Sequence, residues 1–194
     1  MKEINVIRPT THVLFGVLRT AARPALVLAA AAAITLVFSA AGTGDASNGR
    51  IVRTQGDEQF VPNAKIQATL KFTPGHITIA SGESLTLEHG DKTQDPHTLS
   101  IVDTNEVPST IDDVFNCGAP GTVCDEIFSQ FTGQPSGAMF IDAAGTGAGI
   151  DGRLDTLYVE PGHSITEPVT APSGTTLYFI CAIHAWMQGS IDVK

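Results

Sequence analysis

Apolar and polar residues alternate along much of the chain after its first forty residues. From Lys65 onward, Ile66, Ala68, Leu70 and Phe72 alternate with polar neighbours, which is the period of a strand with one buried face. Shorter runs with strand character follow at 77–79, 85–88, 97–102, 157–159, 177–181 and 191–193. Proline and glycine turns separate these runs, and no long helical period appears after residue 41. We therefore expect an all-β fold, a β-sandwich or small barrel.

The N-terminal segment has a different pattern. Residues 25–41 form an uncharged apolar run that follows arginines and ends in small residues, as a secretory signal peptide does. The run is about 17 residues long, near the shortest length that spans a bilayer, so an uncleaved anchor stays an alternative and membrane association stays open. We expect 1–41 to be a signal peptide or anchor helix, 42–64 a linker and 65–194 the folded domain. That domain then lies outside the cytoplasm, whether periplasmic, secreted or held on the outer face of a membrane.

Residues 103–153 interrupt the strand pattern and are rich in glycine, alanine, aspartate and proline. We expect a long, partly irregular insertion there. It contains Cys117 and Cys124, which are close in sequence and should form a disulfide in an oxidising compartment, stabilising the fold by about 2 kcal/mol. The third cysteine, Cys181, is then left as a free thiol that needs an explanation.

Acidic residues outnumber basic residues 20 to 11. This balance argues against nucleic acid as a partner, because a phosphate backbone attracts basic surfaces. Beyond that exclusion, we infer only solubility from the charge.

The chemistry of the chain is concentrated near its C-terminus. Cys181, His184 and Met187 place a thiolate, an imidazole and a thioether within seven residues, between two predicted strands. Thiolate and thioether favour copper(I), and imidazole accepts both copper states. A plane of two histidines and one cysteine with a distant axial methionine is the arrangement used for electron transfer.

A second histidine is available at the start of the strand 97–102. His97 shares the parity of Leu99 and Ile101, and Cys181 shares that of Leu177 and Phe179, so both side chains should point into the interior. Taken singly, His97, Cys181 and Met187 are each more simply explained as a strand-edge or core residue. Together, in this spacing, they predict a metal site at one end of the sandwich.

These motifs resemble those of the cupredoxins, the blue copper proteins of the plastocyanin, amicyanin and azurin type. The string Cys181-x-x-His184-x-x-Met187, followed by Gly189 and a final strand, looks like their copper loop with the short amicyanin-like spacing. The opening strands resemble theirs at Phe72-x-Pro74, Ile77, Ile79, Gly82, Leu85, Leu87 and Asp95-Pro96-His97. The resemblance covers residues 66–102 and 154–194. It implies a cupredoxin-like fold with Greek-key connections and one type 1 copper ion that cycles between Cu(I) and Cu(II), with His97, Cys181 and His184 as trigonal ligands and Met187 as the axial ligand.

The chain departs from the family pattern in two places. The family often has asparagine directly after the first histidine, where this chain has Thr98, so the surroundings of the copper should be tuned differently. The 103–153 insertion is also larger than in the small carriers, and we expect it to cover the site or to form a partner surface.

We therefore expect an electron-transfer protein rather than an enzyme, acting with redox protein partners. His184 is the expected electron port, and Trp186 beside it is either part of a docking patch or a packed loop residue. The main alternative is a copper-delivery protein that uses the same ligands. An oxidase would need further copper centres, and the remaining histidines form no His-x-His pair.

Overall fold

The structure is a computed structural model that describes residues 50–131, 134, 136–143, 145, 147 and 149–194. The chain divides into two units, Met1–Ala40 and Ala41–Lys194. The predicted signal or anchor segment, 1–41, lies outside the described residues. Within the described part of the chain, no helix is long and apolar enough to cross a membrane.

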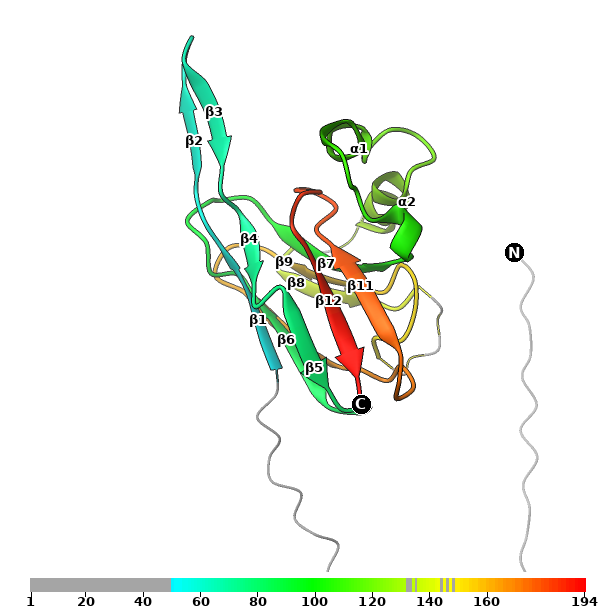
Figure 1. The fold of residues 1–194 in the computed structure, drawn as a ribbon. Coiled ribbons are helices and arrows are strands. Elements are labelled where there is room, and N and C mark those ends of the chain that lie inside the picture. Colours follow the sequence, from blue (N-terminus) through cyan, green and yellow to red (C-terminus); the bar gives the residue numbers. More distant parts are fainter. Residues whose placement is uncertain (1–49, 132–133, 135, 144, 146, 148) are drawn as a thin grey trace, which may run out of the picture. The chain divides into compact units, whose positions relative to one another are not determined.

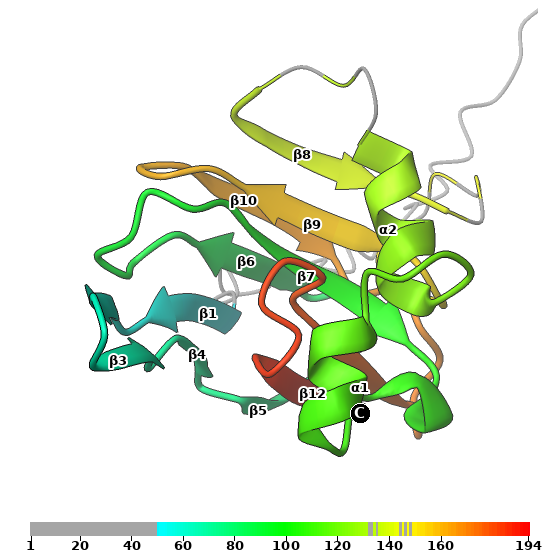
Figure 2. The ribbon, with the colours of Figure 1, turned by 90° about the horizontal axis from the view of Figure 1, so that it is seen from above.

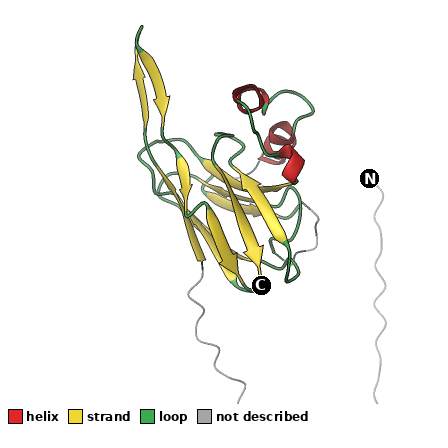
Figure 3. Ribbon diagram, in the orientation of Figure 1, coloured by secondary structure: helices red, strands yellow, loops and turns green. Residues whose placement is uncertain are grey.

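Two sheets form a β-sandwich, as the alternating pattern predicts (Figures 1 and 3). One sheet has four strands in the order β10-β6-β1-β4, and the other has six in the order β5-β12-β11-β7-β9-β8. Their bounds are β1 Arg50–Gln55, β4 Lys71–Thr73, β5 His76–Ile79, β6 Ser84–Glu88, β7 His97–Val102, β8 Ala138–Ile141, β9 Thr156–Val159, β10 Ser164–Pro168, β11 Thr176–Ile180 and β12 Gln188–Val193. The pairs β1 with β6 and β12 with β5 are parallel, and the other pairs are antiparallel. The all-β fold class with a long insertion is confirmed.

The space between the two sheets is filled by the inward-facing residues of the strands, which alternate with outward-facing ones. Phe179 of β11 lies opposite Ile101 of β7 in register and packs edge-on against Phe72 of β4 at 5.1 Å between ring centroids. Cys181 and Met187 belong to the same buried cluster. The parity argument for Cys181 therefore holds, because continuing β11 by two residues beyond Phe179 keeps the side chain inside.

Strand β12 passes very close to its neighbours at Gly189. A Cβ added to Gly189 would lie 2.3 Å from the carbonyl oxygen of Gly75 and 2.3 Å from Cζ of Phe179. Only glycine fits there, so this residue allows the strand that follows the 181–187 loop to approach the Gly75 backbone and the Phe179 ring closely.

The predicted strand from Lys65 to Phe72 is wrong in its extent and burial. The structure divides it into β3 (Lys65–Ala68) and β4, and β3 pairs with β2 (Glu58–Val61) in a separate hairpin. Ile66 is 84% exposed, because this hairpin extends beyond the sandwich (Figure 1). Alternation alone identified a strand but could not show that one half of it lacks a facing sheet.

The predicted linker 42–64 is also corrected from Arg50 onward. Strand β1 lies inside the four-stranded sheet, where Val52 is fully buried, and β2 follows it. The sequence RIVRTQ has charged residues around only two apolar positions, and this hid a strand that takes part in the core.

The 103–153 insertion contains more regular structure than predicted. It holds a 3-10 turn (η1, Thr104–Glu106), two helices (α1, Ile111–Asn116, and α2, Val123–Phe131) and strand β8. The Cys117–Cys124 disulfide is present, as predicted, and it joins the end of α1 to the start of α2. Cys124 and Ile127 share a second buried cluster with Ile180 and Ala182, so the insertion packs against the six-stranded sheet beside the 181–187 loop.

Candidate metal centre

Three of the four predicted ligands meet at one end of the sandwich. Sγ of Cys181 lies 3.8 Å from Nδ1 of His97 and 3.8 Å from Nδ1 of His184, and the two nitrogens are 3.2 Å apart. His97 begins β7, whereas Cys181 and His184 lie in the connection between β11 and β12. Two backbone hydrogen bonds fold that connection tightly: Cys181 N–H donates to Met187 O, and Met187 N–H donates to His184 O.

The triangle of donor atoms fits a small metal ion. A point equidistant from the two nitrogens and the sulfur lies about 2.1 Å from each, a distance typical of transition-metal bonds to imidazole and slightly shorter than those to thiolate. His97 and Cys181 are fully buried, and His184 is 5% exposed. A soft thiolate with two imidazoles, closed off from water, suits copper.

Acidic side chains lie on the far side of both histidine rings. Nε2 of His97 is 2.7 Å from Oδ2 of Asp91, and Nε2 of His184 is 3.7 Å from Oδ2 of Asp95 and 3.9 Å from Oε1 of Glu58. The carboxylates favour the tautomers with the proton on Nε2, which leaves the lone pair of each Nδ1 directed at Cys181.

Burial also keeps these groups neutral without a metal. It lowers the pKa of His97 to about 4, although the charge of Asp91 acts in the opposite direction. It lowers the pKa of His184 and raises that of the Cys181 thiol. The histidines are therefore unprotonated ligands at neutral pH, while the thiol needs a bound cation to favour its thiolate.

The residue after His97 braces the thiol and its loop. Thr98 N–H donates to Sγ of Cys181 at 3.4 Å, and Thr98 Oγ1 accepts from the N–H of Ala182 at 2.8 Å. The sequence predicted only that this position would differ from the asparagine of the family. The structure shows that threonine ties β7 to the cysteine loop.

Met187 lies at the end of the same loop and is 1% exposed. It shares the buried cluster with Cys181 and packs among apolar residues rather than facing solvent. Its place in the fold is compatible with the axial position, which stays a prediction.

An apolar groove lies beside His184. The indole of Trp186 stands edge-on to the His184 ring at 5.3 Å between centroids, donates through Nε1 to Leu70 O at 3.2 Å, and is 41% exposed. Trp186 lines a groove of about 520 Å³ between the β2–β3 hairpin and α1. The other lining residues are Glu58, Gln59, Phe60, Ile66, Gln67, Ala68, Ile111 and Phe115. Figure 2 shows the β11–β12 connection between that hairpin and α1.

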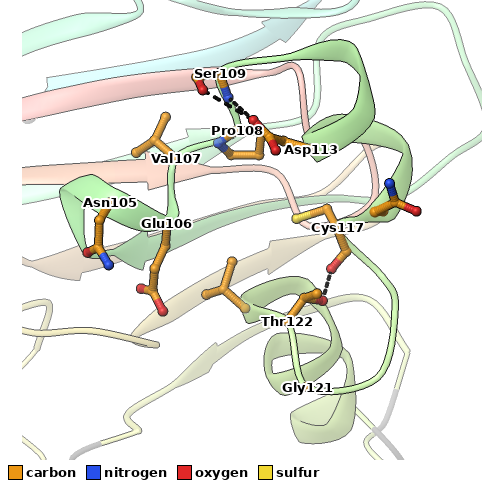
Figure 4. A pocket seen from close by; sticks show the side chains of 11 residues that line it. Asn105, Glu106, Val107, Pro108, Ser109, Asp113, Cys117, Gly121 and Thr122 are labelled. Carbon is orange, nitrogen blue, oxygen red and sulfur yellow. Dashed lines mark hydrogen bonds between the residues drawn. The ribbon is translucent and has the colours of Figure 1, made fainter.

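A second hollow, of about 400 Å³, lies between η1, α1 and the start of α2 (Figure 4). Several of its polar groups already have partners: Asp113 accepts from Ser109, Thr122 donates to Cys117 O, and Glu106 pairs with Arg153. None of the predicted ligands lines it. The candidate metal centre is therefore separate from this hollow.

Sequence reasoning missed Asp91, which contacts His97 directly. Asp91 lies between strands in the polar run from His89 to Asp95, where an aspartate usually means a solvated turn. Nothing in its spacing marks it as a partner of a residue six positions later.

The chain matches no protein-family model and no curated protein. Among solved structures it is similar to a purple cupredoxin from Nitrosopumilus maritimus, at 12% identity over 75% of this chain and 99% of that one, with a TM-score of 0.40. It is also similar to auracyanin from Roseiflexus castenholzii (21% identity, 75% and 96% coverage, TM-score 0.41) and to plastocyanin from Dryopteris crassirhizoma (22%, 74% and 99%, 0.35). The case for a metal centre rests on the converging donor atoms of this chain.

Proposed function

We propose that this protein is a type 1 copper electron carrier that works outside the cytoplasm. His97, Cys181 and His184 would hold one copper ion, with Met187 as the fourth ligand. The observation that carries the proposal is the triangle formed by Sγ of Cys181 and two Nδ1 atoms, with sides of 3.8, 3.8 and 3.2 Å. Copper supplies a one-electron couple between Cu(I) and Cu(II) when bound.

The protein's own part is to hold one ligand geometry and to keep water away. The hydrogen bonds of Thr98 fix the cysteine loop, and the carboxylates behind the histidines favour the tautomers with the proton on Nε2. Side chains that move little between two oxidation states favour fast electron transfer. We assign His184 as the electron port, because it is the ligand beside the groove, with Trp186 forming part of the docking surface for a redox partner.

Burial favours a carrier over a copper-delivery protein. A delivery site must pass its ion to another protein through exposed ligands, whereas His97 and Cys181 are fully buried and Met187 is 1% exposed. The same burial restricts the access of a substrate to these side chains, which supports a role without catalysis. The Cys117–Cys124 disulfide supports an oxidising compartment.

Visible absorption of the purified protein loaded with Cu(II) tests the proposal. We expect an intense thiolate-to-copper band that bleaches with ascorbate and is lost in Cys181→Ser. The matched control is the double variant Cys117→Ser, Cys124→Ser, which removes the other two cysteines and should keep the band. A colourless protein that still binds copper would support delivery, and one that does not bind copper would refute both functions.

A further inference from the structure

A buried carboxylate stands directly behind one of the proposed copper ligands. Oδ2 of Asp91, in the connection between β6 and β7, lies 2.7 Å from Nε2 of His97, and both side chains are fully buried. The two atoms are in close contact without the alignment of a good hydrogen bond, and Nε2 has no hydrogen-bond partner in the described structure. A charge on Asp91 therefore acts most strongly on the His97 ring.

Asp91 is held as an anion by neutral donors. Its Oδ1 accepts from the backbone N–H of Thr93 at 2.9 Å and from its hydroxyl at 2.7 Å, and Oδ2 accepts from the hydroxyl of Thr54. Both carboxylate oxygens therefore act as acceptors, and three donated hydrogen bonds favour the ionised form of the side chain. The side chain is both ionised and fixed in position.

No lysine or arginine neutralises this charge in the described part of the chain. The nearest basic side chains are the imidazoles of His97 and of His89, whose Nε2 is 3.8 Å from Oδ1. His89 already donates from that nitrogen to the carbonyl of Asp95 at 3.0 Å. Three donors and the His97 contact also occupy the oxygens of Asp91, which leaves it unsuited to bind a second cation.

We propose that Asp91 is a positioning residue that fixes the His97 tautomer and lowers the reduction potential of the copper centre. The inference rests on the proposed function. A fixed negative charge against the ligand ring stabilises the more highly charged Cu(II) form more than Cu(I), and it makes the imidazole a stronger donor. Asp91 acts through His97 and does not bind the metal itself.

Protein-film voltammetry of the copper-loaded wild type and Asp91→Asn tests the inference. We expect the variant to shift the ratio of oxidised to reduced protein at a fixed potential at least tenfold toward reduced, a rise of about 59 mV or more for one electron. The matched control is Asp95→Asn, which removes the same charge beside His184, where the side chain is 50% exposed. Water screens that charge, so its shift should be clearly smaller. Equal shifts in the two variants would overturn the inference.

Two further measurements cover the case in which Asp91→Asn does not fold. Thr54→Val keeps the shape and the charge but removes one donor to Oδ2, so more negative charge falls on His97 and the potential should drop; a rise would contradict the inference. In the metal-free wild type, ¹⁵N shifts of the His97 ring should place the proton on Nε2, and a proton on Nδ1 would equally overturn it. A wild type without the visible band refutes the proposed function itself, whereas a normal band with an unchanged potential in Asp91→Asn refutes only the role of Asp91.

Discussion

Thr98 Oγ1 accepts a hydrogen bond from the backbone N–H of Ala182 at 2.8 Å, one residue beyond Cys181. The same oxygen accepts from Ser100 Oγ at 3.1 Å, and Ser100 Oγ in turn accepts from Thr156 Oγ1 at 3.0 Å. All of these groups are buried. A chain of hydroxyls thus connects the cysteine loop to β7 and β9 through side chains without charge.

Replacement of Thr98 by valine should therefore destabilise the protein. The variant keeps the volume but leaves the N–H of Ala182 and the hydroxyl of Ser100 without their acceptor, which should cost about 1–3 kcal/mol of unfolding free energy. Urea denaturation of the metal-free protein measures this loss. Thr98→Ser is the control, because it retains the hydroxyl, and equal midpoints for the two variants would contradict the bracing role.

Met187 should affect the potential more than the fold when it is replaced by leucine. The swap conserves volume, so the unfolding free energy should fall by less than about 1.5 kcal/mol. Loss of the axial thioether should nevertheless change the reduction potential while the thiolate band remains. Met139→Leu in β8 is the control. An unchanged potential in Met187→Leu would show that the thioether is not a ligand.

The groove beside His184 should affect the association of two protein molecules rather than the properties of the proposed copper site. Trp186→Ala should slow electron self-exchange, measured by NMR line broadening, by about tenfold, because a buried tryptophan commonly contributes 1.4 kcal/mol or more to an interface. The potential should change little. Phe128→Ala removes a comparably exposed aromatic ring of α2 that does not line the groove, and its rate should stay near the wild-type value.

The ion pair between Arg153 and Glu106 in the insertion should make the free energy of unfolding depend on pH. Nη2 of Arg153 donates to Oε1 of Glu106 at 2.6 Å, and this hydrogen bond holds the pKa of Glu106 below its ordinary value of 4.5. A lowered pKa means that the pair stabilises the fold fully above about pH 4.5 and loses this contribution as the pH falls through the lower folded value.

Glu106→Gln should therefore cost about 1–2 kcal/mol at pH 7 and progressively less below pH 4.5, measured by denaturation at a series of pH values. Glu126→Gln serves as the control. Its carboxylate also contacts Arg153 but is 43% exposed, so its effect should be smaller. A constant difference between wild type and Glu106→Gln down to about pH 3 would refute the linkage.

The residues with strand parity were predictable from the sequence. His97 and Cys181 each share a face with apolar neighbours, and both are fully buried where two strands approach the same end of the sandwich. Period-2 alternation carries this information because each strand has one face against the core. The position of His184 follows from its distance of three residues from Cys181 in a tight loop.

The features that sequence reasoning did not predict depend largely on contacts between distant segments. Ile66 alternates correctly but has no sheet to face, so its strand is exposed. The helices α1 and α2 have six and nine residues, too few for a helical period to stand out in a glycine-rich segment. Asp91 shows its role only when β7 brings His97 against it, and no local pattern marks that contact.

Three of the four proposed ligands lie in the single connection from Cys181 to Met187, and only His97 comes from elsewhere in the chain. The redox properties of the proposed centre therefore depend mainly on this one loop. Exchanging seven consecutive residues would replace three of the four proposed ligands and their spacing, while β7 would keep His97 and the rest of the sandwich would stay unchanged. Variation in this loop offers evolution, or an engineer, a way to change the redox chemistry without redesigning the fold.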